Sequence, residues 1–300
     1  MKKRVVRSKH LFLGISLFMI GLFLVIAFFS KIDFQDKIAL IPIEGTIGFS
    51  DGLGSVGVYP EDVISDIDKA NKDSSIKAII LEINSPGGTV VASEEIAKAV
   101  KNSKKPVVAL IHEVGASGAY WIASASDKIV ASEMSVTGSI GVISSYVEFS
   151  QLMEKYGITY NDLKAGKYKD IGSPYKELTA EEKTILESVV NKIYDHFVKQ
   201  VSINRNISEA KVRELATGMI YLGNDAKEFG LIDVIGDKNK AVEIAKELAG
   251  IKKADLVKYE KEITLVDIFG KLSTNAFYFM GKGIGSEFSP SLIKQFQFTA

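Results

Sequence analysis

Hydrophobic positions in the first half of the chain form short, nearly continuous runs that alternate with stretches of helical spacing. Ile76 to Ile83 is the clearest run, because only two polar residues interrupt it. A strand covered on both faces of a sheet has this pattern, whereas a strand with one wet face alternates. Residues 90–100, which follow, repeat apolar positions at helical spacing. This alternation predicts an α/β fold with a mostly parallel sheet.

The same pattern assigns an element to most segments between residues 37 and 259. Pro60 suits the first turn of a helix, and residues 179–182 (TAEE) are typical of a helix start. We expect strands at 37–43, 76–83, 107–111, 128–131, 159–164 and 255–259, a strand fed by the turn at 137–143, and short strands near 222–223 and 231–235; helices are expected at 60–70, 90–100, 117–125, 149–156, 179–204, 208–215 and 237–248.

Three of the predicted strands end in glycine-bearing segments. These are residues 84–88 (NSPGG), 115–118 (GASG) and 137–141 (TGSIG). In open parallel sheets, sites gather at the carboxyl ends of the strands. We therefore expect these three segments to be neighbours and to frame the functional site.

The N-terminal block has the pattern of a membrane segment. Leu11 to Phe29 carries no charge and, as a helix, would span roughly 30 Å, the thickness of a bilayer core. The basic residues at positions 2–9 should keep this flank cytoplasmic and place the rest of the chain on the other side. A cleaved signal peptide is the alternative, but residues 27–30 (AFFS) are a poor cleavage site. We predict an uncleaved single-pass anchor in the cell membrane.

These patterns divide the chain into five parts. A basic segment covers residues 1–10, the predicted anchor 11–30, a short linker 31–36, the α/β domain 37–259 and a C-terminal tail 260–300. The tail is apolar but irregular, and no pattern assigns it a structure.

Composition excludes several kinds of chemistry. The 37 basic residues balance the 37 acidic residues, so bulk charge indicates neither a nucleic acid nor an acidic partner. Cysteine is absent, which excludes disulfides, thiol nucleophiles and cysteine metal sites. Only His10, His112 and His196 are present, and no metal-binding spacing such as HExxH occurs. A general base must therefore be sought among few histidines or elsewhere.

Ser117 is the candidate nucleophile. It lies among small residues where a predicted strand gives way to a helix, beside free N–H groups and the positive end of the helix dipole. This is the physical setting of a nucleophile next to an oxyanion hole. The alternative is a tight turn in which Ser117 only caps the helix. The segment alone leaves both interpretations open.

The base for such a serine is a histidine or a lysine. His112 lies five residues upstream on the same strand, and His196 lies beside the apolar face of the longest helix. A lysine serves only when it is neutral, so its pKa must fall from about 10.4 to roughly 7–8, which costs about 4 kcal/mol. Lys164, Lys167 and Lys169 share one glycine-bearing stretch. Spacing alone does not choose among them.

Four blocks of sequence, taken together, resemble a known family. They occur in the order 84–88 (NSPGG), 115–120 (GASGAY), 137–142 (TGSIGV) and 166–170 (GKYKD). In this order they are similar to the signature blocks of the signal peptide peptidase A family, which are membrane-anchored serine peptidases with a Ser-Lys dyad. The resemblance covers about residues 37–245. It implies the Clp protease/crotonase-like fold, a spiral of repeated ββα units, in the family's single-domain form.

The resemblance also implies roles for individual residues. Ser117 matches the nucleophile, Lys169 the general base and Ser139 the residue that orients the lysine amine. The backbone amides of Gly88 and Gly118 match the oxyanion hole. A hydroxyl at position 139 can hold a neutral amine, where a carboxylate would raise its pKa. The family further implies a ring-shaped homo-oligomer such as an octamer, in which Ser117 and Lys169 meet across an interface, and it implies no cofactor or metal.

The function expected from this resemblance is cleavage of apolar, extended peptides such as remnant signal peptides, outside the cytoplasm and without a nucleic-acid partner. Substrate strands would add to a sheet edge through backbone hydrogen bonds. One alternative is a crotonase-like acyl-CoA enzyme, whose oxyanion amides would look alike but which needs no Ser117 with Lys169. Another is a non-catalytic membrane scaffold. Whichever function holds, two placements of the apolar tail are open: it packs on a neighbouring subunit, or it lies near the active site.

Overall fold

The computed structural model describes residues 19–21, 35–49 and 57–259. The predicted anchor at 11–30 lies outside these ranges except for Met19 to Gly21, and the tail at 260–300 lies outside them entirely. Among the residues described, no helix is both long enough and apolar enough to cross a bilayer.

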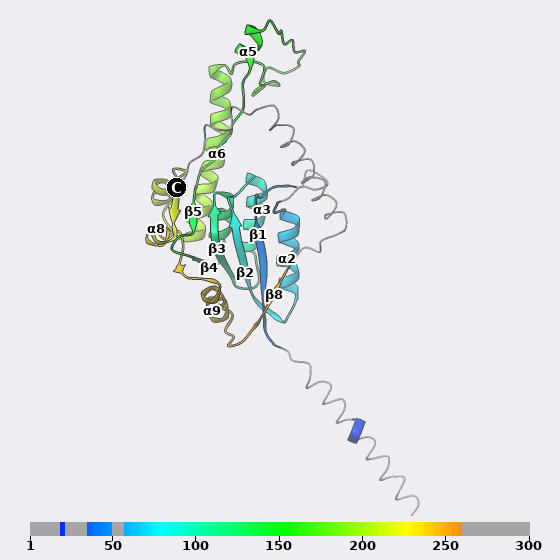
Figure 1. Cartoon of the computed structure of the whole chain (residues 1–300), viewed down its shortest axis with the longest axis vertical. Helices are drawn as coiled ribbons and strands as arrows, with labels where there is room; N and C mark the ends of the chain where they lie inside the picture. The colour runs from blue at the N-terminus through cyan, green and yellow to red at the C-terminus, as the bar shows by residue number, and fades with distance from the viewer. Residues whose placement is uncertain (1–18, 22–34, 50–56, 260–300) are drawn as a thin grey trace, which may run out of the picture.

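One sheet organises the described chain (Figure 1). Its hydrogen-bonded order is β6-β5-β3-β2-β1-β8, and β4 pairs with both β3 and β7. All pairs are parallel except β5 with β6, which confirms the predicted α/β class. The strands are β1 (Lys37–Glu44), β2 (Ile76–Ser85), β3 (Val107–Ala116), β4 (Lys128–Ala131), β5 (Val136–Gly138), β6 (Ile220–Leu222), β7 (Val234–Ile235) and β8 (Asp255–Lys258).

Helices cover both faces of this sheet, which explains why the central strands read as unbroken apolar runs. In β2, Ile79, Leu81 and Ile83 face the larger core, while Ile80 faces the smaller one. The larger core packs under α2 (Pro60–Lys72), α3 (Val90–Lys101), α4 (Gly118–Ser124), α6 (Ala180–Arg205), α7 (Glu209–Leu215) and α8 (Gly223–Glu228); the smaller core packs under α9 (Lys238–Ala249).

The register of the sheet brings the three glycine-bearing strand ends together. Ser85 at the end of β2 pairs with Gly115 of β3, and Gly115 pairs in turn with Thr137 of β5. The prediction that segments 84–88, 115–118 and 137–141 are neighbours is therefore confirmed. Segment 115–116 itself differs from expectation, because β3 continues through Gly115 and Ala116 instead of ending at Ile111.

Two predicted strands are absent from the described chain. Residues 159–164 form no strand, and no strand follows the turn at 137–143 before α5. Leu163 in the first segment is fully exposed, and this segment pairs with no strand of the sheet. It belongs to an excursion, residues 143–176, that leaves the sheet and includes the short helix α5 (Ser150–Lys155).

The excursion is held at the far end of α6 (Figure 1). Thr179 and Glu182 form the capping box expected from the sequence, so α6 begins there and runs for 26 residues, about 39 Å. No residue of α5 is buried. The excursion exposes a dense set of large apolar side chains: Ile143, Tyr146, Val147, Phe149, Leu152, Tyr156, Ile158, Tyr160, Leu163, Tyr168 and Tyr175.

Tyr120 connects α4 to Leu231, a residue 111 positions later in the chain. Its side chain is fully buried, and its hydroxyl donates to the carbonyl oxygen of Leu231 at 2.9 Å. Burial raises the pKa of the Tyr120 phenol well above its usual range, so the hydroxyl stays a donor at any working pH.

We expect Tyr120→Phe to lower the free energy of unfolding by about 1–2 kcal/mol, because it leaves the Leu231 carbonyl buried without its donor. Urea denaturation at one fixed protein concentration measures this. The control is Ser74→Ala, which removes an exposed hydroxyl outside the excursion and should change the stability by less than about 0.5 kcal/mol. Equal effects of the two variants would contradict the role given to the Tyr120 hydroxyl.

Candidate active site

Ser117 occupies a strained backbone position between β3 and α4. Its φ is 53° and its ψ is −124°, a conformation that costs a non-glycine residue about 1–3 kcal/mol. Ser117, Ser139 and Asn206 are the described non-glycine residues with positive φ, and the first two line the same pocket. The Ser117 hydroxyl makes no helix-capping hydrogen bond, so the structure gives no support to the interpretation of Ser117 as a cap alone.

Neighbouring elements hold Ser117 in this conformation. Its amide donates to the Gly138 carbonyl of β5 at 2.9 Å, and its carbonyl accepts from the Trp121 amide at 3.0 Å. The Trp121 ring stacks on Phe197 of α6 with centroids 4.8 Å apart. The strain is therefore offset by sheet pairing on one side and by aromatic packing beneath α4 on the other.

Gly88 approaches this turn with its backbone. Ile47 accepts from the Thr89 amide and donates to the Gly87 carbonyl, both at 2.9 Å, so the Gly88 N–H points away from Ile47. A side chain cannot fit here, since a Cβ on Gly88 would lie 1.8 Å from the Ile47 carbonyl oxygen. Within the described residues, the Gly88 amide has no acceptor and remains available to a substrate.

Gly118 places a second amide beside the first. It is the opening residue of α4, where helix N–H groups lack partners within the helix. A Cβ built on Gly118 would lie 3.3 Å from the Gly88 nitrogen and 2.2 Å from the hydroxyl oxygen of Ser93 on α3. Two amides and the Ser117 hydroxyl therefore converge on a small volume, which is the arrangement of an oxyanion hole beside a nucleophile.

Ser139 lies across this volume, directly after β5. Its φ is 51°, and its amide donates to the Met219 carbonyl at 2.8 Å, which fixes the strained turn. Ser139 lines the pocket together with Ser117, Gly88 and Gly118. Four of the five predicted site residues are thus brought together.

The pocket has a volume of about 620 Å³ and is largely apolar around this polar centre. Its walls include Val90 at the start of α3, Val142 and Ile143 after β5, and Ile193 from α6. A second hollow of about 920 Å³ continues along α6, sharing Val142, Ile143, Val190 and Asn191 with the first. Together they form a groove whose shared wall is mostly apolar, while the lining of the second hollow also includes Glu148, Glu177, Lys183 and Glu187.

Lys169, the fifth predicted residue, is not in the pocket. Its side chain is exposed in the excursion, and its amide closes a turn onto the Gly166 carbonyl at 3.2 Å. Lys167 contacts Glu181 at the start of α6 at 2.6 Å, whereas the α6 residues that line the pocket begin at Val190. The rise between residues 181 and 190 is about 14 Å. A single protomer therefore does not bring Lys169 to Ser117.

The described histidines lie apart from the Ser117 hydroxyl. His112 stands 3.7 Å from Glu82, and His196 hydrogen-bonds Glu94 at 2.9 Å; neither lines the pocket. In the part of the chain that the structure describes, no group of three or more histidine, aspartate or glutamate side chains could hold a metal ion. Sequence reasoning missed Ser93, because its packing against Gly118 appears only in three dimensions.

Two protein-family models match the chain. The model of peptidase family S49 matches residues 99–252, and the model of the NfeD1b N-terminal domain matches residues 38–151.

Several known proteins are also similar to this chain in sequence. A protein of Methanocaldococcus jannaschii, named as a candidate protease, is 40% identical over 83% of this chain and 82% of its own length. A protein of Enterococcus faecium, named as a candidate signal peptide peptidase SppA, is 37% identical over 76% of this chain and 68% of its own. Protease 4 of Haemophilus influenzae is 36% identical over 71% of this chain but only 35% of its own length.

A solved structure, a serine-to-alanine mutant of the 1510-N membrane-bound stomatin-specific protease, shares the fold. The TM-score is 0.51 at 14% identity, covering 76% of this chain and 99% of that chain. The S49 model spans half of the chain, including Ser117 and Ser139 but not the strand end at 84–88. The chain therefore belongs to peptidase family S49, the family of signal peptide peptidase A, and is a serine endopeptidase.

Proposed function

We propose that this serine endopeptidase is anchored in the membrane and cuts apolar, extended peptides with a Ser-Lys dyad made by two adjoining copies of the chain. The observation that carries the proposal is the strained Ser117 facing the free amides of Gly88 and Gly118. Peptidase chemistry needs this combination, since the hydroxyl must attack a carbonyl whose oxygen the amides then stabilise.

The reaction runs in two halves. The Ser117 oxygen attacks the scissile carbonyl while Lys169 takes its proton, and the oxyanion lies against the two glycine amides. Lys169 returns the proton to the leaving amine as the C–N bond breaks, which leaves an acyl group on Ser117. Lys169 then takes a proton from a water molecule, whose oxygen attacks the acyl carbonyl, and returns that proton to the Ser117 oxygen as the ester C–O bond breaks and the acid leaves. Ser139 holds the amine by its hydroxyl in the neutral form that both halves require.

Two observations favour a dyad shared between copies in a ring-shaped homo-oligomer. The segment that carries Lys169 contacts α6 at Glu181, about 14 Å along the helix from the first α6 residue that lines the pocket of the same protomer. The excursion that carries it exposes a density of apolar side chains, from Ile143 to Tyr175, that is unusual for a monomer in water. Docking of the excursion onto a neighbour would bury these side chains and deliver the lysine.

The groove supports an extended apolar substrate. Val142, Ile143 and Val190 line it over both hollows, so alternate side chains of a bound strand would meet apolar walls. Remnant signal peptides have this character. The Clp protease/crotonase-like spiral of ββα units is the fold we assign to this machinery.

Membrane anchoring rests on the uncharged segment 11–29 and its basic flank. It would place the domain at 37–259 on the extracytoplasmic face, after the linker at 31–36. One relative by structure is itself named a membrane-bound protease. Substrates left in the bilayer would then lie near the groove.

Ser117→Ala and Lys169→Ala should each reduce peptide cleavage by about a thousandfold or more, because each removes half of the proton-transfer pair. Co-expression of the two variants under separate tags, followed by tandem purification, tests the sharing of the dyad. A random mixture should regain about one quarter of the wild-type rate, since a quarter of interfaces join an intact Ser117 to an intact Lys169.

Robust turnover by pure Lys169→Ala would contradict the assignment of Lys169 as the general base of a Ser-Lys dyad. Absence of complementation in a verified mixed oligomer would instead place both groups in one copy. Labelling by a serine-directed phosphonate separates the enzyme from a non-catalytic scaffold, which would give no adduct at Ser117.

Gly118→Ala tests the oxyanion hole. The added methyl group would meet the Ser93 hydroxyl and push the Gly118 amide out of place, so we expect kcat to fall by about a hundredfold, the usual effect of losing one donor. Ser93→Gly removes the two nearest obstructing atoms but leaves the Gly88 nitrogen 3.3 Å from the added methyl, so the double variant should recover part of the loss. Failure of the double variant to exceed Gly118→Ala, with folding intact by circular dichroism, would contradict this account of the amide.

A further inference from the structure

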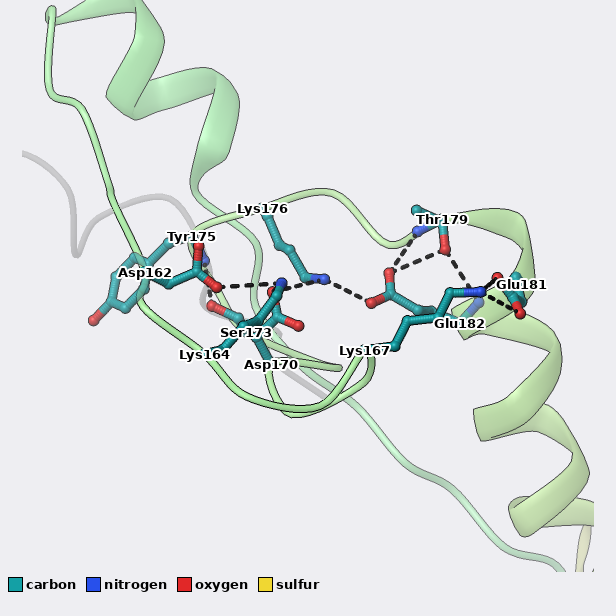
Figure 2. A network of polar contacts seen from close by, with 10 residues as sticks. All are labelled: Asp162, Lys164, Lys167, Asp170, Ser173, Tyr175, Lys176, Thr179, Glu181 and Glu182. Atoms are coloured by element: carbon teal, nitrogen blue, oxygen red, sulfur yellow. Dashed lines mark hydrogen bonds and ion pairs between the residues drawn. The ribbon is translucent and has the colours of Figure 1, made fainter.

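Several ion pairs connect the side chains of the segment that carries Lys169 (Figure 2). Asp170 is their centre: its Oδ2 lies 2.5 Å from Lys164 and 2.9 Å from Lys176. Lys176 extends the chain to Glu182 at 2.6 Å, and Glu182 in turn caps α6 through Thr179. The network thereby ties the turn after Lys169 to the first turn of the helix.

All the acidic side chains of this segment have partners. Asp162 pairs with Lys164 at 3.2 Å, and Glu181 pairs with Lys167 and accepts from the Tyr168 hydroxyl. Glu177 accepts from Gln151 at 2.8 Å. With Asp170 and Glu182 in the network above, every carboxylate between residues 162 and 182 has at least one partner, and the second oxygen of Asp170, Oδ1, is buried without one.

The lysines of this segment, unlike its carboxylates, do not all have partners. Lys164, Lys167 and Lys176 each have at least one carboxylate partner, and those carboxylates raise the pKa of all three amines. Lys169, by contrast, makes no ion pair or side-chain hydrogen bond with any described residue. Its side chain points to solvent while that of its neighbour Asp170 is only 11% exposed.

We propose that Asp170 is a positioning residue whose carboxylate is held by Lys164 and Lys176 so that it cannot pair with Lys169. The inference rests on the proposed role of Lys169 as general base. Asp170 is the carboxylate closest in sequence to that amine, and a free one would hold the amine charged. The two flanking lysines therefore act on catalysis indirectly, by occupying Asp170.

The electrostatics of the network agree with this role. Hydrogen bonds from Lys164 and Lys176 lower the pKa of Asp170 to about 2, so its carboxylate stays ionised and bound throughout the neutral range. The charged and titratable groups around it are Lys164, Lys176, Asp162 and Glu182, with Lys167, Tyr168 and Glu181 on the adjoining turn. Losing both lysines leaves Asp170 with Lys169 as the nearest cation in sequence.

The test compares pH profiles of kcat/KM in the full-length protein with an apolar fluorogenic peptide. In Lys164→Gln/Lys176→Gln, the ascending limb should move to higher pH by about one unit, because the freed carboxylate favours the charged amine. Activity at neutral pH should then fall about tenfold. Adding Asp170→Asn removes the freed carboxylate, and the triple variant should return the limb to within a few tenths of a unit of wild type.

A merely structural role predicts the opposite order, since the triple variant would be at least as impaired as the double. An unmoved limb in the double variant, or no return in the triple variant, overturns the proposal. The matched control is Lys211→Gln/Lys240→Gln, which removes two paired lysines from α7 and α9 and should leave the profile unchanged.

A measurement on the wild-type oligomer covers the case in which the variants fail to assemble. Graded acetylation followed by mass spectrometry should modify Lys169 at lower pH than Lys164, Lys167 and Lys176. Simultaneous modification of all four would overturn the proposal. The dyad is judged separately: full activity of Lys169→Met would refute the proposed function, whereas an inactive Lys169→Met with an unmoved limb in the double variant refutes only the role of Asp170.

Discussion

Close backbone approach at the ends of three parallel strands is the constraint on which the site depends. β2, β3 and β5 end side by side, and the chain leaves each of them through residues that a side chain would not fit or that carry positive φ. Gly88 must lie against Ile47, and Gly118 must lie against Ser93, for two amides to face one hydroxyl. Sheet pairing to Gly138 and the stacking of Trp121 on Phe197 keep Ser117 in its strained conformation. The larger core beneath is what offsets that strain.

Much of this could be predicted from sequence, because it follows from local pattern. Continuous apolar runs identify strands buried on both faces, and the order of strand ends then follows from parallel pairing. The capping box at Thr179 and Glu182 fixes the start of α6 correctly. The predicted strand at 159–164 is wrong, because Tyr160 and Leu163 are exposed and the segment pairs with no strand of the sheet. The distance of Lys169 from the pocket has no local signal, since it depends on the length and direction of α6.

The two proposed catalytic groups, Ser117 and Lys169, lie in different structural settings. The nucleophile and the amides belong to the most rigid part of the molecule, where small residues permit only one arrangement. The lysine belongs to a segment without a core of its own, shaped instead by a chain of ion pairs from Lys164 to Glu182. Exposed ion pairs contribute little to global stability, but a network of this kind can select one loop conformation among many. In this protein that conformation leaves one amine unpaired.

The uninterrupted helix between these settings has a geometric consequence. α6 lines the pocket with residues around Tyr194 and meets the lysine-bearing segment near Glu181, so its pitch sets the separation of the two. Insertion of one full turn would move that segment outward by about 5.4 Å without altering any contact at Ser117. In the proposed ring, helix length would therefore act as a spacer that matches each protomer to the curvature of the assembly, and a longer or shorter α6 would require a ring of different radius.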